Sequence, residues 1–164
     1  MRSTPVLEYK RRPQAYDRFR EHLHTQGFTL YPEEFFCPFS THPLVDIAAK
    51  MGAFYWGFEY KSKGDSISMG VKQVECYREW FDYVVLVSEK NLDHRLSENY
   101  WKLRNIGAGI WLYDPTRDKR IVKASPSIQT GERRGSVSRR FAAAQRGLNN
   151  SNALTEMDLR NFMA

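Results

Sequence analysis

The sequence predicts a mixed α/β fold in which helices flank a central β-sheet. Apolar runs of strand length alternate with segments of helical periodicity, and residues 83–88 are apolar almost throughout. A continuous apolar run of this length is typical of a central strand that is buried on both faces. Because strands come first and helix–strand pairs follow, we expect at least one parallel crossover in the sheet.

The first elements that we predict are a helix and a β-hairpin. Apolar residues recur at helical spacing over 13–26, between a proline and a glycine that suit the two helix ends. An extended aromatic segment follows over 28–39. The clearest strand covers 53–61, and we expect it to pair as a hairpin with the short apolar run 43–49.

The later elements alternate between helix and strand. In order, we predict a helix over 69–81, strands over 83–88 and 110–113 with a helix over 96–105 between them, and a short strand over 121–123. After residue 124 the composition shifts to Ser, Gly and Arg, with helical patterns over 137–145 and 154–163. We therefore divide the chain into an α/β core, 1–124, and a basic, partly helical C-terminal extension, 125–164.

Basic side chains gather in the C-terminal part of the chain. The formal net charge is +6, and nine Lys and Arg residues stand between Arg117 and Arg146, opposed only by Asp118 and Glu132. Such a cluster favours a polyanionic partner, whereas the alternative is a solvated, flexible end. The side chains that we expect to bind nucleic acid here are Arg133, Arg134, Arg139 and Arg140.

Composition narrows the class of protein. A chain of 164 residues is long enough for one domain with a real core. No run approaches the roughly 20 apolar residues of a membrane span, and residues 1–12 are charged, unlike a signal peptide. We therefore expect a cytoplasmic protein with no membrane partner. The two cysteines lack Cys-x-x-Cys spacing, and neither a P-loop nor a paired-histidine motif occurs.

Glu59 and Lys61 are the first candidates for chemistry. They are two residues apart on a predicted strand, so both side chains point to one face, while Phe58 and Tyr60 point to the other. If Asp46 lies on the neighbouring strand, two carboxylates converge and repel by roughly 4 kcal/mol at about 4 Å. A divalent cation relieves that repulsion, and hard oxygen ligands favour Mg²⁺ or Mn²⁺. The alternative is a surface ion pair on a solvated face.

Gln73 and Tyr77 are the second pair of candidates. They are four residues apart on a predicted helix, so they lie on one helix face, directly after the loop that leaves Lys61. A Gln amide can anchor a backbone or a base edge, and a Tyr can stack on a base or bind a phosphate. The alternative is that Tyr77 packs in the core and Gln73 is merely exposed.

Together these residues resemble the PD-(D/E)xK nuclease superfamily, which has a restriction-endonuclease-like fold. Asp46 ends the run His-Pro-Leu-Val-Asp, and Glu59-Tyr-Lys61 follows on the next strand. The stretch Gln73-Val-Glu-Cys-Tyr77 resembles the Gln-xxx-Tyr helix motif of the RecB-like branch. The match covers roughly residues 13–113, and it departs from the family pattern because a valine, not a proline, precedes Asp46.

The resemblance implies roles for individual residues. The metal ligands that it implies are Asp46, Glu59 and the main-chain carbonyl of Tyr60. Lys61 would be the catalytic lysine. Family members often carry a further acidic ligand on the first helix, for which Glu21 is the candidate and Asp17 the second choice. Gln73 and Tyr77 would support the site or contact nucleic acid.

The function that we expect is therefore hydrolysis of phosphodiester bonds in DNA by a Mg²⁺- or Mn²⁺-dependent endo- or exodeoxyribonuclease. RNA stays open as a substrate. Because cleavage of two strands needs two active centres, a homodimer is also expected. The alternative is a non-catalytic nucleic-acid-binding or assembly protein that retains the nuclease fold.

Overall fold

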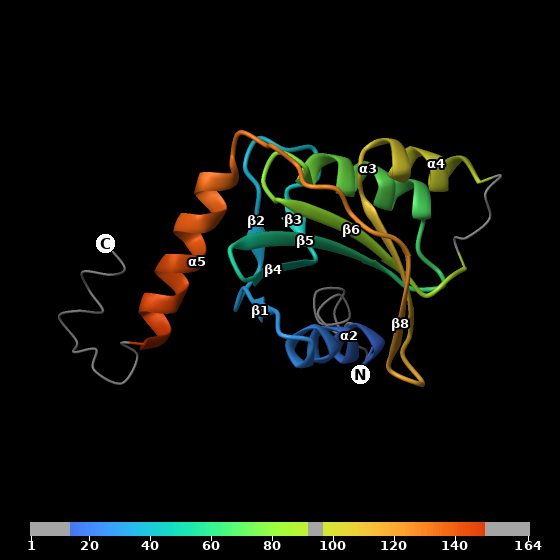
Figure 1. The fold of residues 1–164 in the computed structure, drawn as a ribbon, viewed down its shortest axis with the longest axis horizontal. Helices are drawn as coiled ribbons and strands as arrows, with labels where there is room; N and C mark the ends of the chain where they lie inside the picture. Colours follow the sequence, from blue (N-terminus) through green and yellow to red (C-terminus); the bar gives the residue numbers. More distant parts are fainter. Residues whose placement is uncertain (1–13, 92–96, 150–164) are drawn as a thin grey trace, which may run out of the picture.

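A six-stranded mixed sheet forms the centre of the computed structural model, which describes residues 14–91 and 97–149 (Figure 1). Its strand order is β1-β4-β5-β6-β7-β8, and β2 and β3 form a separate two-stranded sheet. The strands are β1 (Thr29–Leu30), β2 (Phe35–Phe36), β3 (Leu44–Val45), β4 (Ile47–Met51), β5 (Phe54–Lys61), β6 (Tyr83–Ser88), β7 (Gly109–Asp114) and β8 (Lys119–Ala124).

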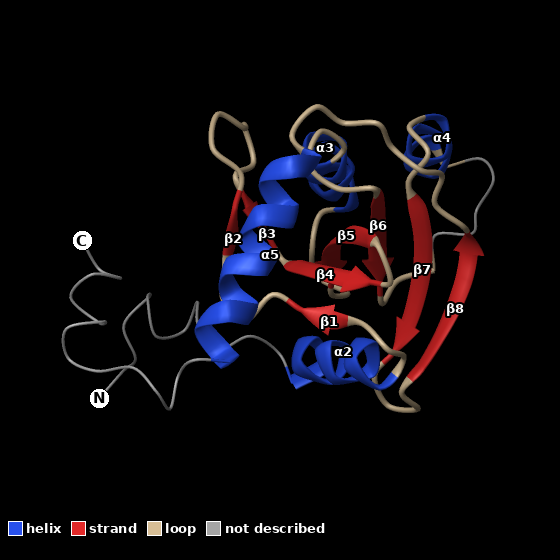
Figure 2. Cartoon of the chain, turned by 60° about the vertical axis from the view of Figure 1, so that its left-hand side comes forward, coloured by secondary structure: helices blue, strands red, loops and turns tan. Residues whose placement is uncertain are grey.

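Helices cover both faces of the sheet. They are α2 (Gln14–Thr25), α3 (Ile67–Tyr77), α4 (Glu98–Asn105) and α5 (Arg134–Asn149). Helices α3 and α4 lie on one face and α2 lies on the other, while α5 lies beside β2 and β3 (Figures 1 and 2). The predicted mixed α/β class is confirmed, and the architecture is compatible with a restriction-endonuclease-like core.

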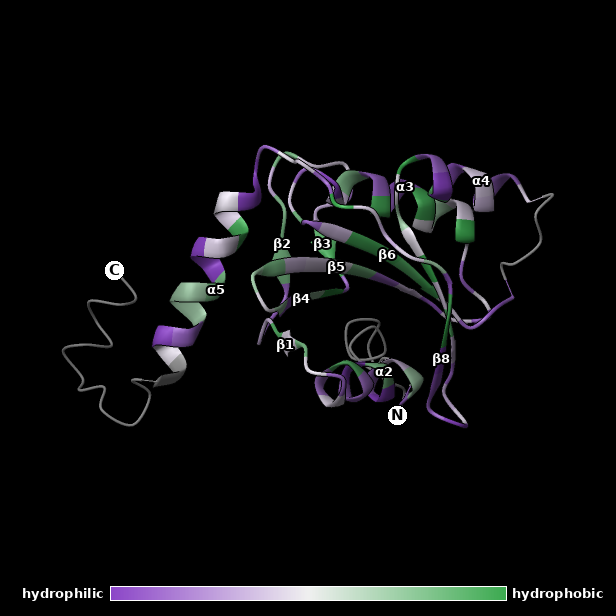
Figure 3. Cartoon of the chain, viewed as in Figure 1, coloured by the Kyte–Doolittle hydropathy of each residue, from purple (hydrophilic) through white to green (hydrophobic). Residues whose placement is uncertain are grey.

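The predicted central strand is confirmed. Strand β6 has the predicted bounds, and Val84, Val85, Leu86 and Val87 have no exposed surface. Most of its length is coloured as hydrophobic in Figure 3. Strands β5 and β7 both pair with it in parallel, whereas the other pairs in the sheet are antiparallel. The expected parallel crossover therefore occurs twice, once through α3 and once through α4.

Strand β5 separates two hydrophobic clusters, as its alternation predicts. Phe58 and Tyr60 point toward α2 and pack around Phe19 in a largely aromatic cluster. On the other face, Gly57 lies directly under the ring of Phe81, because an added Cβ would be 2.6 Å from its Cδ2 atom. Glu59 and Lys61 share this second face with α3.

Helix α3 begins and ends earlier than the predicted range 69–81. It begins early because the Ser66 side chain caps it by accepting a hydrogen bond from the Met69 amide at 3.2 Å. It ends at Tyr77 because Trp80 and Phe81 turn off the helix and become buried in the core. Burial of two large aromatic side chains outweighs the continued helical turn.

The chain after β8 packs back on the core. The main-chain N–H of Gln129 donates to the main-chain carbonyl of Asp82 at 2.7 Å, and Val137 and Phe141 of α5 join the cluster that contains Phe35. The division at residue 124 stays a prediction, and the helix predicted over 154–163 lies outside the described residues. No helix among the described residues has both the length and the apolar character that a membrane crossing requires.

Candidate functional site

Asp46 lies at the single-residue break between β3 and β4, where the chain leaves one sheet for the other. Pairing of β4 with β5 stops at Ile47 and Phe58, so no strand residue opposes the Tyr60 amide from this side. The Asp46 carboxylate takes that place and accepts from the Tyr60 amide at 2.8 Å. The Tyr16 hydroxyl of α2 donates to the Asp46 carbonyl at 2.7 Å, which fixes the break from the other face.

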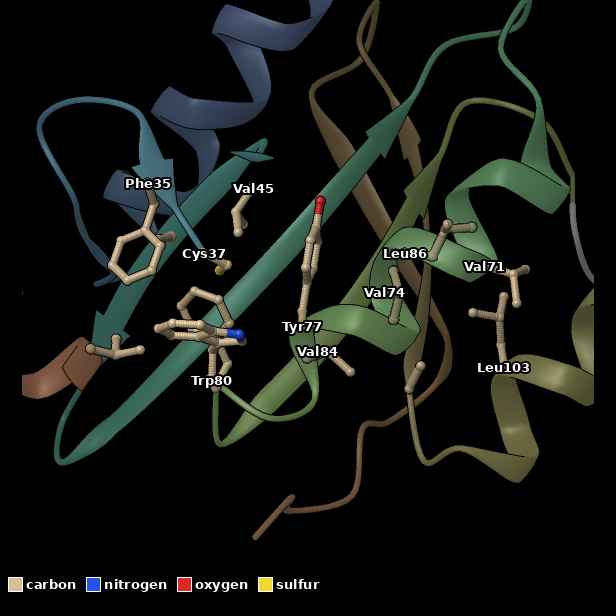
Figure 4. Packing of buried hydrophobic residues seen from close by; sticks show 14 of the residues in the cluster. Phe35, Cys37, Val45, Val71, Val74, Tyr77, Trp80, Val84, Leu86 and Leu103 are labelled. Carbon is tan, nitrogen blue, oxygen red and sulfur yellow. The ribbon is translucent and has the colours of Figure 1, made fainter. Parts of the chain in front are cut away.

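Glu59 points from β5 toward α3 and is 2% exposed. Its Oε1 accepts a hydrogen bond of 2.5 Å from the Tyr77 hydroxyl, and its Oε2 lies 3.2 Å from Lys61 Nζ. The same hydroxyl oxygen is 3.2 Å from the Leu44 carbonyl. Figure 4 shows the Tyr77 side chain reaching from the end of α3 to β5. The carboxyl group is therefore held by donors from two different elements.

The two carboxyl groups interact directly. Burial, the negative charge of Asp46 and a hydrogen bond with Asp46 raise the pKa of Glu59 to about 8, against opposing effects of Tyr77 and Lys61. In the metal-free protein at neutral pH, Glu59 therefore carries a proton beside Asp46. Burial and the neighbouring Glu59 raise the pKa of Tyr77 well above its usual value, so its hydroxyl remains a donor.

Lys61 lies along the backbone of α3 at Gly70. A Cβ at Gly70 would be 2.8 Å from Lys61 Cε and 2.7 Å from Leu86 Cδ1. Only a glycine therefore leaves room for the Lys61 stem between the helix and β6. We did not single out Gly70 from the sequence, although a glycine inside a helical pattern is a known sign of close packing.

Asp46, Glu59 and Lys61, predicted from distant parts of the sequence, thus lie together at one end of β5. The predicted main-chain ligand also points to this side. In a strand, the N–H and C=O groups of one residue face the same neighbour, and the Tyr60 N–H faces Asp46. The Tyr60 carbonyl therefore lies on the Asp46 side of β5.

Gln73 and Tyr77 have different environments. Tyr77 is completely buried and has no surface with which to contact nucleic acid; its hydroxyl supports Glu59 instead. Gln73 is partly exposed, and its Oε1 atom is buried without a hydrogen-bond partner among the described residues. Of the two roles that the resemblance implied, Tyr77 therefore takes the supporting one.

The two acidic candidates of the first helix lie away from its buried side. Tyr16, Phe19 and Leu23 form the buried side of α2, whereas Glu21 and Asp17 are exposed. Glu21 is 140° around the helix from Tyr16, the residue that reaches Asp46, by the ordinary helical repeat of about 100° per residue. Within the described part of the chain, no group of three or more His, Cys, Asp or Glu side chains is placed to hold a metal ion.

The predicted nucleic-acid-binding arginines lie toward the other end of β5. Arg134 contacts the buried carboxylate of Asp82, which also accepts from the Tyr55 amide at 2.8 Å. Tyr55 and Lys61 are six residues apart on β5, or roughly 20 Å. Near Arg134, Arg133 pairs with Glu79 at 3.7 Å, Arg140 donates to the Phe36 carbonyl, and Arg139 is exposed on α5.

Comparison with known proteins gives a likeness of fold. No protein-family model and no curated protein matches the sequence. An XisH family protein from Nostoc punctiforme has a TM-score of 0.50 and 12% identity, over 72% of this chain and 100% of that one. An fdxN element excision controlling factor protein from Anabaena variabilis has a TM-score of 0.50 and 13% identity, over 66% and 97%. At these identities the likeness concerns the fold alone.

Proposed function

We propose that this protein is a Mg²⁺- or Mn²⁺-dependent nuclease that hydrolyses phosphodiester bonds in DNA. The observation that carries the proposal is the convergence of Asp46, Glu59 and Lys61 at one end of β5. A restriction-endonuclease-like architecture is compatible with this placement of the three groups.

The donor set fits a hard divalent cation. The negative charge of Asp46 helps to keep a proton on Glu59, and a cation that replaces this proton removes the repulsion between the two carboxylates. Asp46, Glu59 and the Tyr60 carbonyl would hold it, and Mg²⁺ commonly takes only one or two protein carboxylates together with water and substrate phosphate oxygens. When bound, the cation supplies a Lewis acid for the phosphoryl oxygen and lowers the pKa of water.

Side chains of the protein itself would orient the reacting groups and stabilise the charge that develops on the phosphate. The Lys61 ammonium lies 3.2 Å from Glu59, and Gly70 leaves it little freedom, so it can stabilise negative charge that develops on the phosphate or orient the attacking water. Tyr77 fixes the direction of the Glu59 carboxyl group. Such fixed groups lower the cost of reaching the reactive geometry.

A non-catalytic nucleic-acid-binding or assembly role is the second candidate. It is favoured by the low exposure of the candidate groups, since Glu59 is 2% and Lys61 8% exposed. The neighbour from Anabaena variabilis is named as an excision controlling factor, and such a role is a proposal for this chain. In this alternative the contact of 3.2 Å between Glu59 and Lys61 is structural and lies where β5 packs against α3.

Cleavage assays test the nuclease proposal. Labelled single-stranded, duplex and branched DNA are incubated with the wild type, Lys61→Ala and Glu59→Gln, with Mg²⁺, with Mn²⁺ and with EDTA. We expect metal-dependent cleavage that either substitution lowers by on the order of a hundredfold or more. Lys72→Ala, at an exposed lysine of α3, is the matched control and should cleave as the wild type does. Equal cleavage by wild type and Lys61→Ala would contradict the proposal.

Metal-dependent stabilisation separates the two candidates. Mn²⁺ at about a hundredfold excess over its dissociation constant should stabilise the wild type by about 2.7 kcal/mol, and Glu59→Gln should lose this gain. No stabilisation, together with DNA binding and no cleavage across the panel, would favour the non-catalytic role.

A further inference from the structure

The hairpin formed by β2 and β3 presents an apolar face to solvent. Phe36 pairs with Leu44 across the two strands, and these side chains are 51% and 41% exposed. The next pair, Phe35 and Val45, faces the core at 1% and 5% exposure. Phe39 lies near the tip at 95% exposure. We call Phe36, Phe39 and Leu44 the hairpin face.

Phe39 has a backbone conformation that is unfavourable for a bulky side chain. Its φ angle is +63°, a left-handed conformation that is uncommon for a bulky residue and that glycine or asparagine adopts more easily. The exposed ring contributes little to the core. Backbone conformations of this kind cluster at active sites, ligand-binding segments and switch regions.

Positive charge borders the hairpin face on the side of α5. A pocket of about 390 Å³ lies between Pro38 of the hairpin and the start of α5, and its lining includes Arg133, Arg139 and Arg140 with Glu132 as its one acidic side chain. A second pocket, which Phe39 itself lines, carries Glu75, Glu79 and Glu132 with one arginine, Arg78, so the proposed phosphate contacts belong to the α5 side of the hairpin. The Arg133 guanidinium is 5.8 Å from the centre of the Phe39 ring, although it also pairs with Glu79 at 3.7 Å. Aromatic rings beside guanidinium groups are the combination that binds single-stranded nucleic acid.

The hairpin face continues from the candidate site. The Leu44 carbonyl is 3.2 Å from the Tyr77 hydroxyl, which in turn bonds to Glu59. Asp46 follows Leu44 by two residues, a distance of roughly 7 Å along an extended chain. Figure 2 shows β2 and β3 beside α5, so the same hairpin adjoins the arginines on its other side. A strand bound at Asp46 and Glu59 can therefore continue over the hairpin toward α5.

We propose that the hairpin face binds the unpaired bases of a nucleic-acid strand, with Phe36 and Phe39 stacking on bases and Arg133 and Arg139 contacting phosphates. The position of the reacting phosphate beside Leu44 rests on the proposed nuclease function. The inference names the substrate class: a single strand, or an unpaired end of a duplex, because paired bases have no free face for stacking. A symmetric contact between two copies of the hairpin would bring their arginines together, which disfavours self-association.

Binding without metal tests this inference apart from the nuclease proposal. Fluorescence anisotropy in EDTA compares a labelled single-stranded oligonucleotide with the same sequence as a blunt duplex. We expect the wild type and Lys61→Ala to bind the single strand at least tenfold more tightly than the duplex. Phe39→Ala should weaken single-strand binding by about tenfold, which is within the range for loss of one stacked base, and leave duplex binding unchanged.

Matched variants make the result specific. Phe54→Ala, at a 40% exposed phenylalanine at the start of β5, should bind as the wild type does, and Phe39→Tyr should retain the stacking. Equal affinity for single strand and duplex, or equal losses in Phe39→Ala and Phe54→Ala, would overturn the inference. Light scattering that shows a dimer lost in Phe36→Ser/Phe39→Ser, with unchanged single-strand affinity, would assign the face to a second copy and also overturn it. Wild-type cleavage of duplex DNA that Phe39→Ala retains would leave the nuclease proposal intact while this inference fails.

Discussion

Each oxygen of the Glu59 carboxyl group has its own neighbour, the Tyr77 hydroxyl at one and the Lys61 ammonium at the other. These contacts do not offset burial and the charge of Asp46, so the pKa of Glu59 rises to about 8. The group is therefore protonated in the folded, metal-free protein over a pH range in which it is ionised in the unfolded chain. Folding and protonation are linked at this residue.

This linkage predicts how stability depends on pH. Between its ordinary pKa of 4.5 and about 8, the folded protein binds a proton at Glu59 that the unfolded chain has lost. The free energy of unfolding should therefore fall as pH rises through this range, by up to about 1.4 kcal/mol per pH unit. Burial lowers the pKa of His22 below 6.5, so below that pH His22 makes the free energy of unfolding rise with pH, opposite to the effect of Glu59. The effect of Glu59 is therefore best measured between pH 6.5 and 8.

Urea unfolding in EDTA at several pH values within this window measures the effect. Glu59→Gln, which cannot ionise, should show a much flatter dependence than the wild type. A saturating concentration of Mn²⁺ should flatten the wild-type slope, because metal binding keeps the Glu59 carboxylate ionised in the folded protein, as it already is in the unfolded chain at this pH. Equal slopes for wild type and Glu59→Gln would contradict the assignment of the proton to Glu59.

The sequence could predict that Glu59 and Lys61 share a face, because the strand repeat depends only on local geometry. The sequence could not predict which groups form hydrogen bonds with the Glu59 carboxyl group and with the neighbouring Tyr60 backbone. The bond from Tyr77 depends on how α3 crosses β5, and the bond from Asp46 to the Tyr60 amide depends on where strand pairing stops. The exposure of Glu21 could not be predicted for a related reason, since a resemblance to a family indicates the helix but not its rotation on the sheet.

The contact of α3 with β5 depends on Gly70. The helix approaches so closely that a methyl group there would lie 2.8 Å from Lys61 Cε and 2.7 Å from Leu86 Cδ1. The flexible lysine end can move more easily than the buried leucine. The main consequence of a larger residue is therefore a displaced ammonium group, not a disrupted core.

Gly70→Ala should lower metal-dependent cleavage by about tenfold to a hundredfold, because a displacement of about 1 Å can cost that much in rate. Stabilisation by Mn²⁺ should change little, since the atoms nearest to an added Cβ belong to Leu86 and Lys61 and not to the proposed metal ligands. The matched control is Gly64→Ala, where an added Cβ meets no atom within 4 Å. Wild-type cleavage rates in Gly70→Ala would show that the Lys61 position is not critical.

Long periodic elements were predictable and short ones were not. The range 83–88 was predicted to the residue because a fully apolar run leaves little choice of bounds. The region 28–39 contains only two-residue strands, β1 and β2, whose partners are distant in sequence and whose ends no local signal marks. The end of α3 at Tyr77 was similarly set by packing of Trp80 and Phe81 in the core.

The C-terminal segment joins parts of the molecule that are far apart in sequence. Val137 is fully buried and Phe141 is 7% exposed, and both pack with Phe35 and other residues of the cluster between α3 and the sheet. Gly131 lies against the end of α3 so closely that an added Cβ would be 2.3 Å from the Glu79 carbonyl oxygen. These contacts could not be predicted from the sequence, because apolar residues are sparse in this segment and arginines are frequent.

A chain shortened to residues 1–124 should therefore lose much of its stability. Burial of two side chains such as Val137 and Phe141 contributes about 3–6 kcal/mol together, a large share of the 5–15 kcal/mol of a typical domain. Thermal unfolding of the shortened chain measures the loss. Phe141→Ala in the full chain should show part of it, and the exposed Ala143→Ser should show none. Unchanged unfolding of the shortened chain would support an independent unit ending at residue 124.

The way in which Asp46 replaces a missing strand neighbour has a practical consequence for anyone who wants an inert protein with which to capture a bound complex. The Asp46 side chain accepts a hydrogen bond from the backbone and also takes part in the proposed chemistry. Its truncation would leave the Tyr60 N–H without this acceptor, so a loss of activity could reflect misfolding as well as lost catalysis. The Lys61 side chain is paired with the side chain of Glu59 instead of with a backbone group. Lys61 is therefore the better position for a substitution that removes the proposed activity and leaves the backbone hydrogen bonds in place.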